Sequence, residues 1–143
     1  MMVSRTWYRV AALVVGAGVL TVSSWPSLSF SPLHWSYEDK IEHLIAYTFL
    51  SYLAACGWGP GRTSGGSRKA GAAVVLALMV FAALEEYHQR WIPGRFVEWG
   101  DWLSDVLGIL TGFFVGRWQN ARPWRKREDR PECASDLCRR EER

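Results

Sequence analysis

Charged and hydrogen-bonding side chains lie at the edges of stretches that are otherwise apolar. The sequence places them in two runs and one pair: Asp39-Lys40-Ile41-Glu42-His43, Glu85-Glu86-Tyr87-His88-Gln89, and Asp101 with Asp105. Ionisable groups beside hydrocarbon are energetically costly and tend to be functional. An imidazole can act as a general base or a nucleophile, and neighbouring carboxylates can assist it. The candidate catalytic residues are therefore His43, Glu86, His88 and Asp101.

Helical spacing places several of these side chains on common faces. Asp39 and His43 are four residues apart and Tyr47 follows one turn later, so the three share one face of a helix. A carboxylate one turn from an imidazole can orient the ring. Three residues of the second run recur at helical spacing and form one patch at the outer end of their helix: Glu85, His88 and Gln89.

The acidic pair begins a stripe that continues through small residues. Gly108 and Gly112 follow Asp101 and Asp105 at helical spacing, and Gly116 extends the series. Two overlapping small-xxx-small repeats let another backbone approach closely in lipid. The segment is therefore expected to pack inside a bundle and to carry Asp105 inward. Its glycines also offer a contact surface for a partner helix.

A tight turn separates the second run from the acidic pair. Pro93-Gly94 favours a turn, because proline presets φ and glycine permits a positive φ, and Arg95 follows directly. This places the Arg95 guanidinium over the outer end of the bundle. Two interpretations stay open: it closes an internal ion-pair network with the nearby carboxylates, or it binds an anionic ligand such as a phosphate or carboxylate.

Four apolar segments must position these groups. They cover residues 7–25, 41–58, 70–88 and 102–118. Each has roughly 17 to 20 residues, and a helix of that length crosses a hydrocarbon core of about 30 Å. A soluble bundle would need a polar face repeating every three or four residues, and residues 72–84 show none. The expected fold is all-α: a polytopic membrane protein with four transmembrane helices in one bundle, residues 1–120.

The tryptophans mark where these helices should meet the membrane surface. All nine lie at or beyond the ends of the apolar segments, and none lies in the middle of one. Indole is amphipathic and settles at the headgroup level of a bilayer. A water-soluble core would bury several of these large side chains. The pattern therefore favours a membrane protein.

Basic residues predict the orientation of the four helices. With four spans, three basic regions fall on one side: the N-terminus with Arg5 and Arg9, the connection with Arg62, Arg68 and Lys69, and the C-terminal region from Arg117 onward. By the positive-inside rule both termini are cytoplasmic, and the polar runs face the extracytoplasmic side. The first segment has no convincing small-x-small cleavage site, so it is expected to remain as an uncleaved helix.

The chain ends in a polar segment, residues 121–143, which helps to bring the mean hydropathy of the whole protein to −0.07. This segment has little apolar content and is expected to be a disordered cytoplasmic tail. Cys133 and Cys138 within it are expected neither to form a disulfide nor to bind zinc, and Cys56 is expected to be a packing residue. His43, His88 and the carboxylates could assemble as metal ligands if the protein is an enzyme. No cofactor or metal is expected, however, because a lone histidine at a helix end is more often hydrogen-bonded than coordinated.

Several of these motifs resemble the VanZ-like family of small bacterial membrane proteins, named for a protein associated with low-level teicoplanin resistance. The resemblance covers roughly residues 39–116 and rests on four motifs: Asp39-Lys40-x-x-His43 with Tyr47 after it, Glu86-x-x-Gln89, Pro93-Gly94-Arg95 and Asp101-x-x-x-Asp105-x-x-Gly108. The family usually has asparagine at the position of Asp105. The resemblance implies a multi-pass protein of the bacterial cytoplasmic (inner) membrane, and it supplies no reaction.

Three functions remain open. The first is binding of an anionic amphiphile, such as a cell-envelope lipid intermediate or a glycopeptide, with a link to teicoplanin resistance implied by the resemblance. The second is a membrane-embedded hydrolase or transferase acting on a lipid-linked phosphate, although no nucleophile elbow or HExxH string is present. The third is a structural or assembly role. The expected partners are the lipid bilayer and such an amphiphile, not nucleic acid. The expected ligand-binding residues are Asp39, Lys40, His43, Glu85, Glu86, Gln89, Arg95, Asp101 and Asp105.

Overall fold

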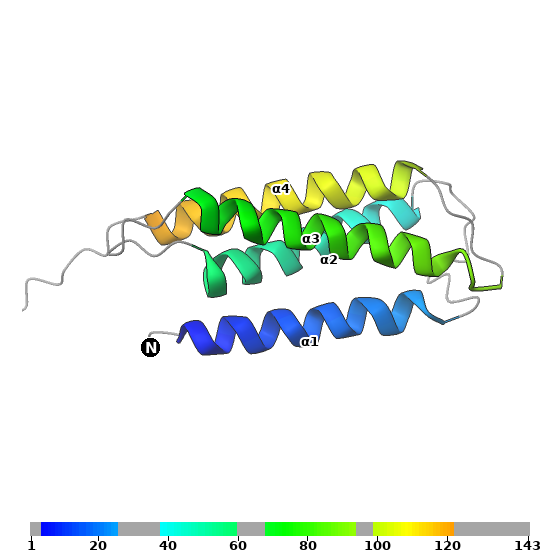
Figure 1. Ribbon diagram of the computed structural model, residues 1–143, viewed down its shortest axis with the longest axis horizontal. Coiled ribbons are helices and arrows are strands. Elements are labelled where there is room, and N and C mark those ends of the chain that lie inside the picture. The colour runs from blue at the N-terminus through cyan, green and yellow to red at the C-terminus, as the bar shows by residue number, and fades with distance from the viewer. Residues whose placement is uncertain (1–3, 26–37, 60–67, 94–98, 122–143) are drawn as a thin grey trace, which may run out of the picture.

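The described part of the chain is a bundle of helices that alternate in direction. The computed structural model describes residues 4–25, 38–59, 68–93 and 99–121. Within these residues the chain forms α1 (Arg5–Ser23), α2 (Glu38–Trp58), α3 (Arg68–Gln89) and α4 (Trp99–Ala121), and no strand. Each helix runs opposite to the one before it (Figure 1), so α2 and α4 run parallel to each other. The expected all-helical fold is confirmed for the described residues.

Each helix overlaps one of the apolar segments but does not share its limits. α2 and α4 begin three residues earlier than the apolar segments at 41 and 102. Hydropathy marks only the apolar part of a helix, whereas the helical backbone of α2 continues through Asp39 and Lys40. At the other end of the sequence, α1 begins after Ser4, whose hydroxyl accepts a hydrogen bond from the Trp7 amide. Serine is a favoured N-cap because it satisfies an otherwise unpaired amide.

Some expected features lie outside the described residues. These are Arg95, the two cysteines Cys133 and Cys138, and nearly all of the tail, of which only Ala121 is described, as the last residue of α4.

α2 and α4 approach to backbone contact along the glycine stripe. A Cβ atom on Gly108 would lie 2.7 Å from the carbonyl oxygen of Leu44, and one on Gly112 would overlap the carbonyl oxygen of Thr48. Both contacts join residues with the same sequence separation, as expected for two parallel helices. The stripe therefore meets α2 of the same chain, in the manner that small-xxx-small repeats allow.

Two arginines of α1 hold its N-terminal end against the C-terminal end of α2. The Arg5 guanidinium donates a hydrogen bond to the Gly59 carbonyl, and the Arg9 guanidinium donates one to the Gly57 carbonyl, both at 3.0 Å. Carbonyls in the last turn of a helix lack partners within the helix, and positive charge there complements the helix dipole. The two contacts therefore fix how α1 lies along α2.

The described helices expose many large apolar side chains and bury several polar ones. Large side chains that are at least 63% exposed occur on every helix: Leu13, Ile45, Leu76 and Phe114. By contrast, Asp105 is fully buried and Glu85 is 1% exposed. Water-soluble monomers rarely expose large contiguous apolar surfaces. By length and composition, α1 and α3 are long and apolar enough to cross a membrane.

The α2–α4 contact predicts that Gly112→Ala destabilises the protein. The new methyl group would overlap the Thr48 carbonyl and force the helices apart, which should lower the free energy of unfolding by about 1–3 kcal/mol. Gly18→Ala is the matched control, because a Cβ atom on Gly18 meets nothing within 4 Å. Chemical denaturation followed by circular dichroism measures both variants. Equal effects at the two glycines would contradict the contact.

Candidate functional site

One end of the bundle buries a group of carboxyl and amide side chains. The first turns of α2 and α4 and the last turn of α3 meet there, because α3 runs opposite to the other two (Figure 1). The buried members are Glu85, Glu86, Gln89, Asp101 and Asp105, each at most 7% exposed. We call these five residues, together with His43 of α2, the acidic cluster.

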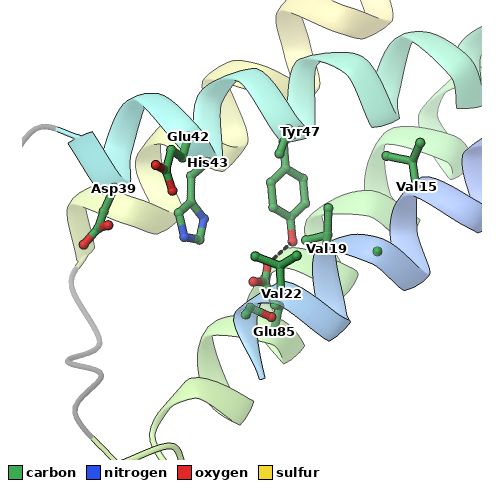
Figure 2. Close-up of a pocket in the computed structure, with 11 residues that line it drawn as sticks. Val15, Val19, Val22, Asp39, Glu42, His43, Tyr47 and Glu85 are labelled. Carbon is green, nitrogen blue, oxygen red and sulfur yellow. Dashed lines mark hydrogen bonds between the residues drawn. The ribbon is translucent and has the colours of Figure 1, made fainter. Parts of the chain in front are cut away.

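Glu85 has hydrogen-bond partners on both carboxylate oxygens. Tyr47 donates its phenolic hydrogen to Oε2 at 2.5 Å, and Gln89 donates an amide hydrogen to Oε1 at 3.0 Å. Figure 2 shows Tyr47 reaching from α2 toward Glu85 on α3. The Tyr47 ring is fully buried and lies nearly parallel to the His43 ring, with 6.5 Å between their centroids. The two hydrogen bonds therefore position Glu85, and the Tyr47 ring lies beside His43.

Two side chains of α2 face two carboxylates of α4. The Lys40 ammonium lies 3.4 Å from Asp101 Oδ1, and His43 Nδ1 lies 2.9 Å from Asp105 Oδ1. The second contact is an ion pair when the imidazole is protonated and a hydrogen bond when it is neutral. Both pairs connect α2 to α4 just before the glycine contacts begin.

Some carboxylate oxygens in the acidic cluster are buried without a hydrogen-bond partner among the described residues. They are both oxygens of Glu86, Oδ1 of Asp101 and Oδ2 of Asp105. The nearby Lys40 ammonium compensates the charge of Asp101. A buried polar atom without a partner costs about 1–3 kcal/mol, and more if it is charged. Glu86 and Asp105 are therefore the two residues whose buried oxygens call for a further partner.

A pocket of about 380 Å³ opens beside the acidic cluster. On one side α1 contributes an apolar wall that includes Val15, Val19 and Val22 (Figure 2). On the other side α2 and α3 contribute polar groups: Asp39, Glu42, His43, Tyr47 and Glu85. An apolar wall facing carboxylates and an imidazole suits a ligand with an apolar chain and a polar head. His43 and Glu85 belong to both the pocket and the cluster.

The structure does not bring all the expected site residues together. Asp39 is exposed at the edge of the pocket. His88 is exposed and lies 3.2 Å from the hydroxyl of Ser24 at the end of α1, so it is not part of the acidic cluster. Arg95 lies outside the described residues. Within the second run, burial selects Glu85, Glu86 and Gln89.

Some residues that shape the site were not among the ligand-binding residues expected from the sequence. Tyr47 was expected on the same face as His43, but it was not counted among the ligand-binding residues, although it donates a hydrogen bond to Glu85. The three valines of α1 carry no charge and gave no signal at all. The four-residue spacing of His43, Tyr47 and Ser51 is the pattern that could have marked this buried face, since Ser51 is also fully buried.

A second hollow of about 410 Å³ lies between α3 and α4. Its wall is apolar and includes Met79 and Phe113, and two arginines, Arg68 and Arg117, also line it. Arg68 begins α3, so this hollow extends toward the end of the bundle opposite to the acidic cluster. A lipid bound only through its apolar chain could occupy this second hollow as well as the pocket beside the acidic cluster, so the two sites must be distinguished in binding experiments.

The hydrogen bonds to Glu85 predict that Tyr47→Phe destabilises the protein. The substitution removes one partner of a buried carboxylate and should lower the free energy of unfolding by about 1–3 kcal/mol. Tyr87→Phe is the control, because Tyr87 lies at the same end of α3 and is 56% exposed. Denaturant unfolding of the two variants and the parent protein measures the difference. A neutral Tyr47→Phe would show that the hydroxyl does not stabilise Glu85.

Comparison with known proteins does not assign this chain to a family. No protein-family model, no curated protein and no solved structure matches this chain. The acidic cluster and the pocket beside it are therefore the features of this chain that indicate a function.

Proposed function

We propose that the protein is a multi-pass membrane protein of the VanZ-like family that binds an amphiphilic ligand of the cell envelope. All four helices would cross the bilayer, with both termini in the cytoplasm and the acidic cluster at the extracytoplasmic face. The observation that carries the proposal is an apolar-walled pocket beside a buried acidic cluster, in a bundle whose outer surface is apolar.

The polar content of α2 and α4 supports four spans rather than arguing against them. These helices have 21 and 23 residues, and about 20 residues suffice to cross a bilayer. The polar side chains that lower their hydropathy include Ser51 and Asp105, which are fully buried. Their outward side chains, such as Ile45 and Leu107, are apolar and more than half exposed. Lipid would therefore contact hydrocarbon on α2 and α4 as it would on α1 and α3.

The distribution of charge supports the proposed orientation. Arg5 and Arg9 lie in the first turns of α1, at one end of the bundle. Arg68 and Lys69 lie at the start of α3, which is at the same end (Figure 1). The acidic cluster occupies the opposite end. By the positive-inside rule the basic end is cytoplasmic, so the pocket faces the extracytoplasmic side.

The pocket supports a ligand whose chain and head bind to different groups. Its apolar chain would lie against the valines of α1, continuous with the lipid around the bundle, and its head would reach His43 and the carboxylates. Carboxylates accept hydrogen bonds from hydroxyl or amino groups of a head. A phosphate head needs additional positive charge, for which Arg95 is the candidate among the expected ligand-binding residues, since Lys40 already faces Asp101. Lipid-linked intermediates of the cell envelope combine a long chain with heads of this kind.

The orientation predicts opposite labelling at the two ends of the bundle. In a background with the native cysteines replaced by serine, Trp91→Cys should react in intact cells with a maleimide that cannot cross the membrane. Lys69→Cys should react only after the cells are lysed. Both positions are exposed on the described structure, so access depends on the side of the membrane alone. Labelling of Lys69→Cys in intact cells would overturn the proposed topology.

The pocket predicts that Val19→Trp reduces binding of the amphiphile. The indole would fill space against which the chain of the ligand lies, and the amount of one co-purifying lipid class should fall at least about tenfold, the equivalent of about 1.4 kcal/mol. Mass spectrometry of lipids extracted from the purified protein measures this. The matched control is Leu13→Trp, which places the same side chain on the exposed face of α1.

Arg68→Ala separates this ligand from phospholipid held in the second hollow. Loss of the same lipid class in Arg68→Ala, or identical lipid profiles in Val19→Trp and Leu13→Trp, would contradict binding at the acidic end. A purely structural role for the cluster predicts identical profiles in all four proteins.

A further inference from the structure

Three helices bring one imidazole and two carboxyl groups to a common point. They are His43 of α2, Glu86 of α3 and Asp105 of α4, and each offers one ligand atom within 4.8 Å of the other two. Ligand atoms bound to one ion at about 2.1 Å lie roughly 3 to 3.5 Å apart. The closest pair, His43 Nδ1 and Asp105 Oδ1, is 2.9 Å apart and forms a hydrogen bond, which an ion bound to Nδ1 would replace.

The oxygens available to a ligand are those without other partners. Both oxygens of Glu86 and Oδ2 of Asp105 accept no hydrogen bond among the described residues, although Glu86 is only 5% exposed and Asp105 is fully buried. The other two carboxyl groups of the acidic cluster are already engaged. Glu85 accepts from Tyr47 and Gln89, and Asp101 faces the Lys40 ammonium. The unsatisfied oxygens thus belong to the same two residues that converge on His43.

We propose that His43, Glu86 and Asp105 bind one divalent transition-metal ion. The ion would supply positive charge to both carboxylates and a partner to the oxygens that lack one, which are both oxygens of Glu86 and Oδ2 of Asp105. This site rests on the geometry of the three residues and does not depend on the amphiphile proposed above.

The donor set indicates which ions the site prefers. An imidazole nitrogen suits Zn²⁺ and its neighbours in the first transition row, whereas Mg²⁺ and Ca²⁺ prefer oxygen alone. Three protein ligands leave a further coordination position for a water or a ligand oxygen, as in zinc sites that act on a bound molecule. His43 also lines the pocket, so the ion and its remaining ligand have a route from there.

The site can be tested by metal binding to the full-length protein without an affinity tag. After chelator treatment and dialysis in detergent, Zn²⁺, Mn²⁺ and Mg²⁺ are titrated separately, and bound metal is measured by elemental analysis. We expect one Zn²⁺ per chain, with Mg²⁺ bound at least about tenfold more weakly. Glu86→Gln and Asp105→Asn should each weaken Zn²⁺ binding at least about tenfold. His88→Ala removes an exposed imidazole outside the acidic cluster and the pocket, and it should leave binding unchanged.

A second measurement needs no variant and covers the case in which a substitution prevents folding. Diethyl pyrocarbonate acylates accessible imidazoles, and peptide mass spectrometry reports each histidine separately. His43 lines the pocket with its side chain 11% exposed, so it should be acylated slowly in the metal-free protein; Zn²⁺ should stop this acylation and leave His88 reactive. Stoichiometric binding that survives both Glu86→Gln and Asp105→Asn would overturn the proposal. Failure of the folded protein to bind Zn²⁺, or failure of Zn²⁺ to protect His43, would overturn it as well. None of these measurements involves the lipid, so they test the metal site independently of the proposed amphiphile.

Discussion

Backbone contact between α2 and α4 determines where the polar groups of this protein lie. Because α4 has glycine at 108 and 112, no side chain keeps its backbone away from Leu44 and Thr48. Two parallel helices in such close contact have little freedom to slide, since a shift of one residue would drive a side chain into a carbonyl oxygen. The ion pair of Lys40 with Asp101 and the contact of His43 with Asp105 follow from this register. A looser pair of helices would leave the same residues too far apart to interact.

The direction of α3 adds the remaining groups. Its last turn ends where α2 and α4 begin, which places Glu85 and Glu86 against the α2–α4 pair. Tyr47 and Gln89 then satisfy Glu85, so that this carboxylate ties α2 to α3. Burying carboxyl groups beneath an apolar surface is costly, and hydrogen bonds to one of them offset only part of that cost. The cost falls on Glu86 and Asp105, the residues with unpartnered oxygens and without a lysine beside them.

The helices of this fold could be predicted from the sequence because hydropathy and helical length are local properties. The limits of α2 and α4 could not, because charged residues such as Asp39 and Lys40 continue a helix without adding to its apolar stretch. Helical spacing placed Glu85 with both Gln89 and His88, but it cannot tell which way the patch rotates in the bundle, and packing turned His88 outward. On the basis of spacing alone, His43 has no second metal-binding residue beside it on its own helix face except the exposed Asp39. Its two carboxylate neighbours come from other helices and are more than 40 residues away in the sequence, a distance across which periodicity carries no information.

The charge of the acidic cluster limits what its pocket can accept. The four carboxyl groups of the cluster face only Lys40 and His43 as potential cations among the described residues, so at least two lack a counter-charge unless they are protonated. When these carboxyl groups are ionised and no metal is bound, the pocket repels a phosphate and favours a head that donates hydrogen bonds. A divalent ion on His43, Glu86 and Asp105 would change this preference, because it neutralises the carboxylates of Glu86 and Asp105 and offers a coordination position to a phosphate oxygen. Whether the pocket prefers a hydroxyl-rich head or an anionic head therefore depends on whether the ion is bound. His43, Glu86 and Asp105 would control both the binding of the ion and this preference.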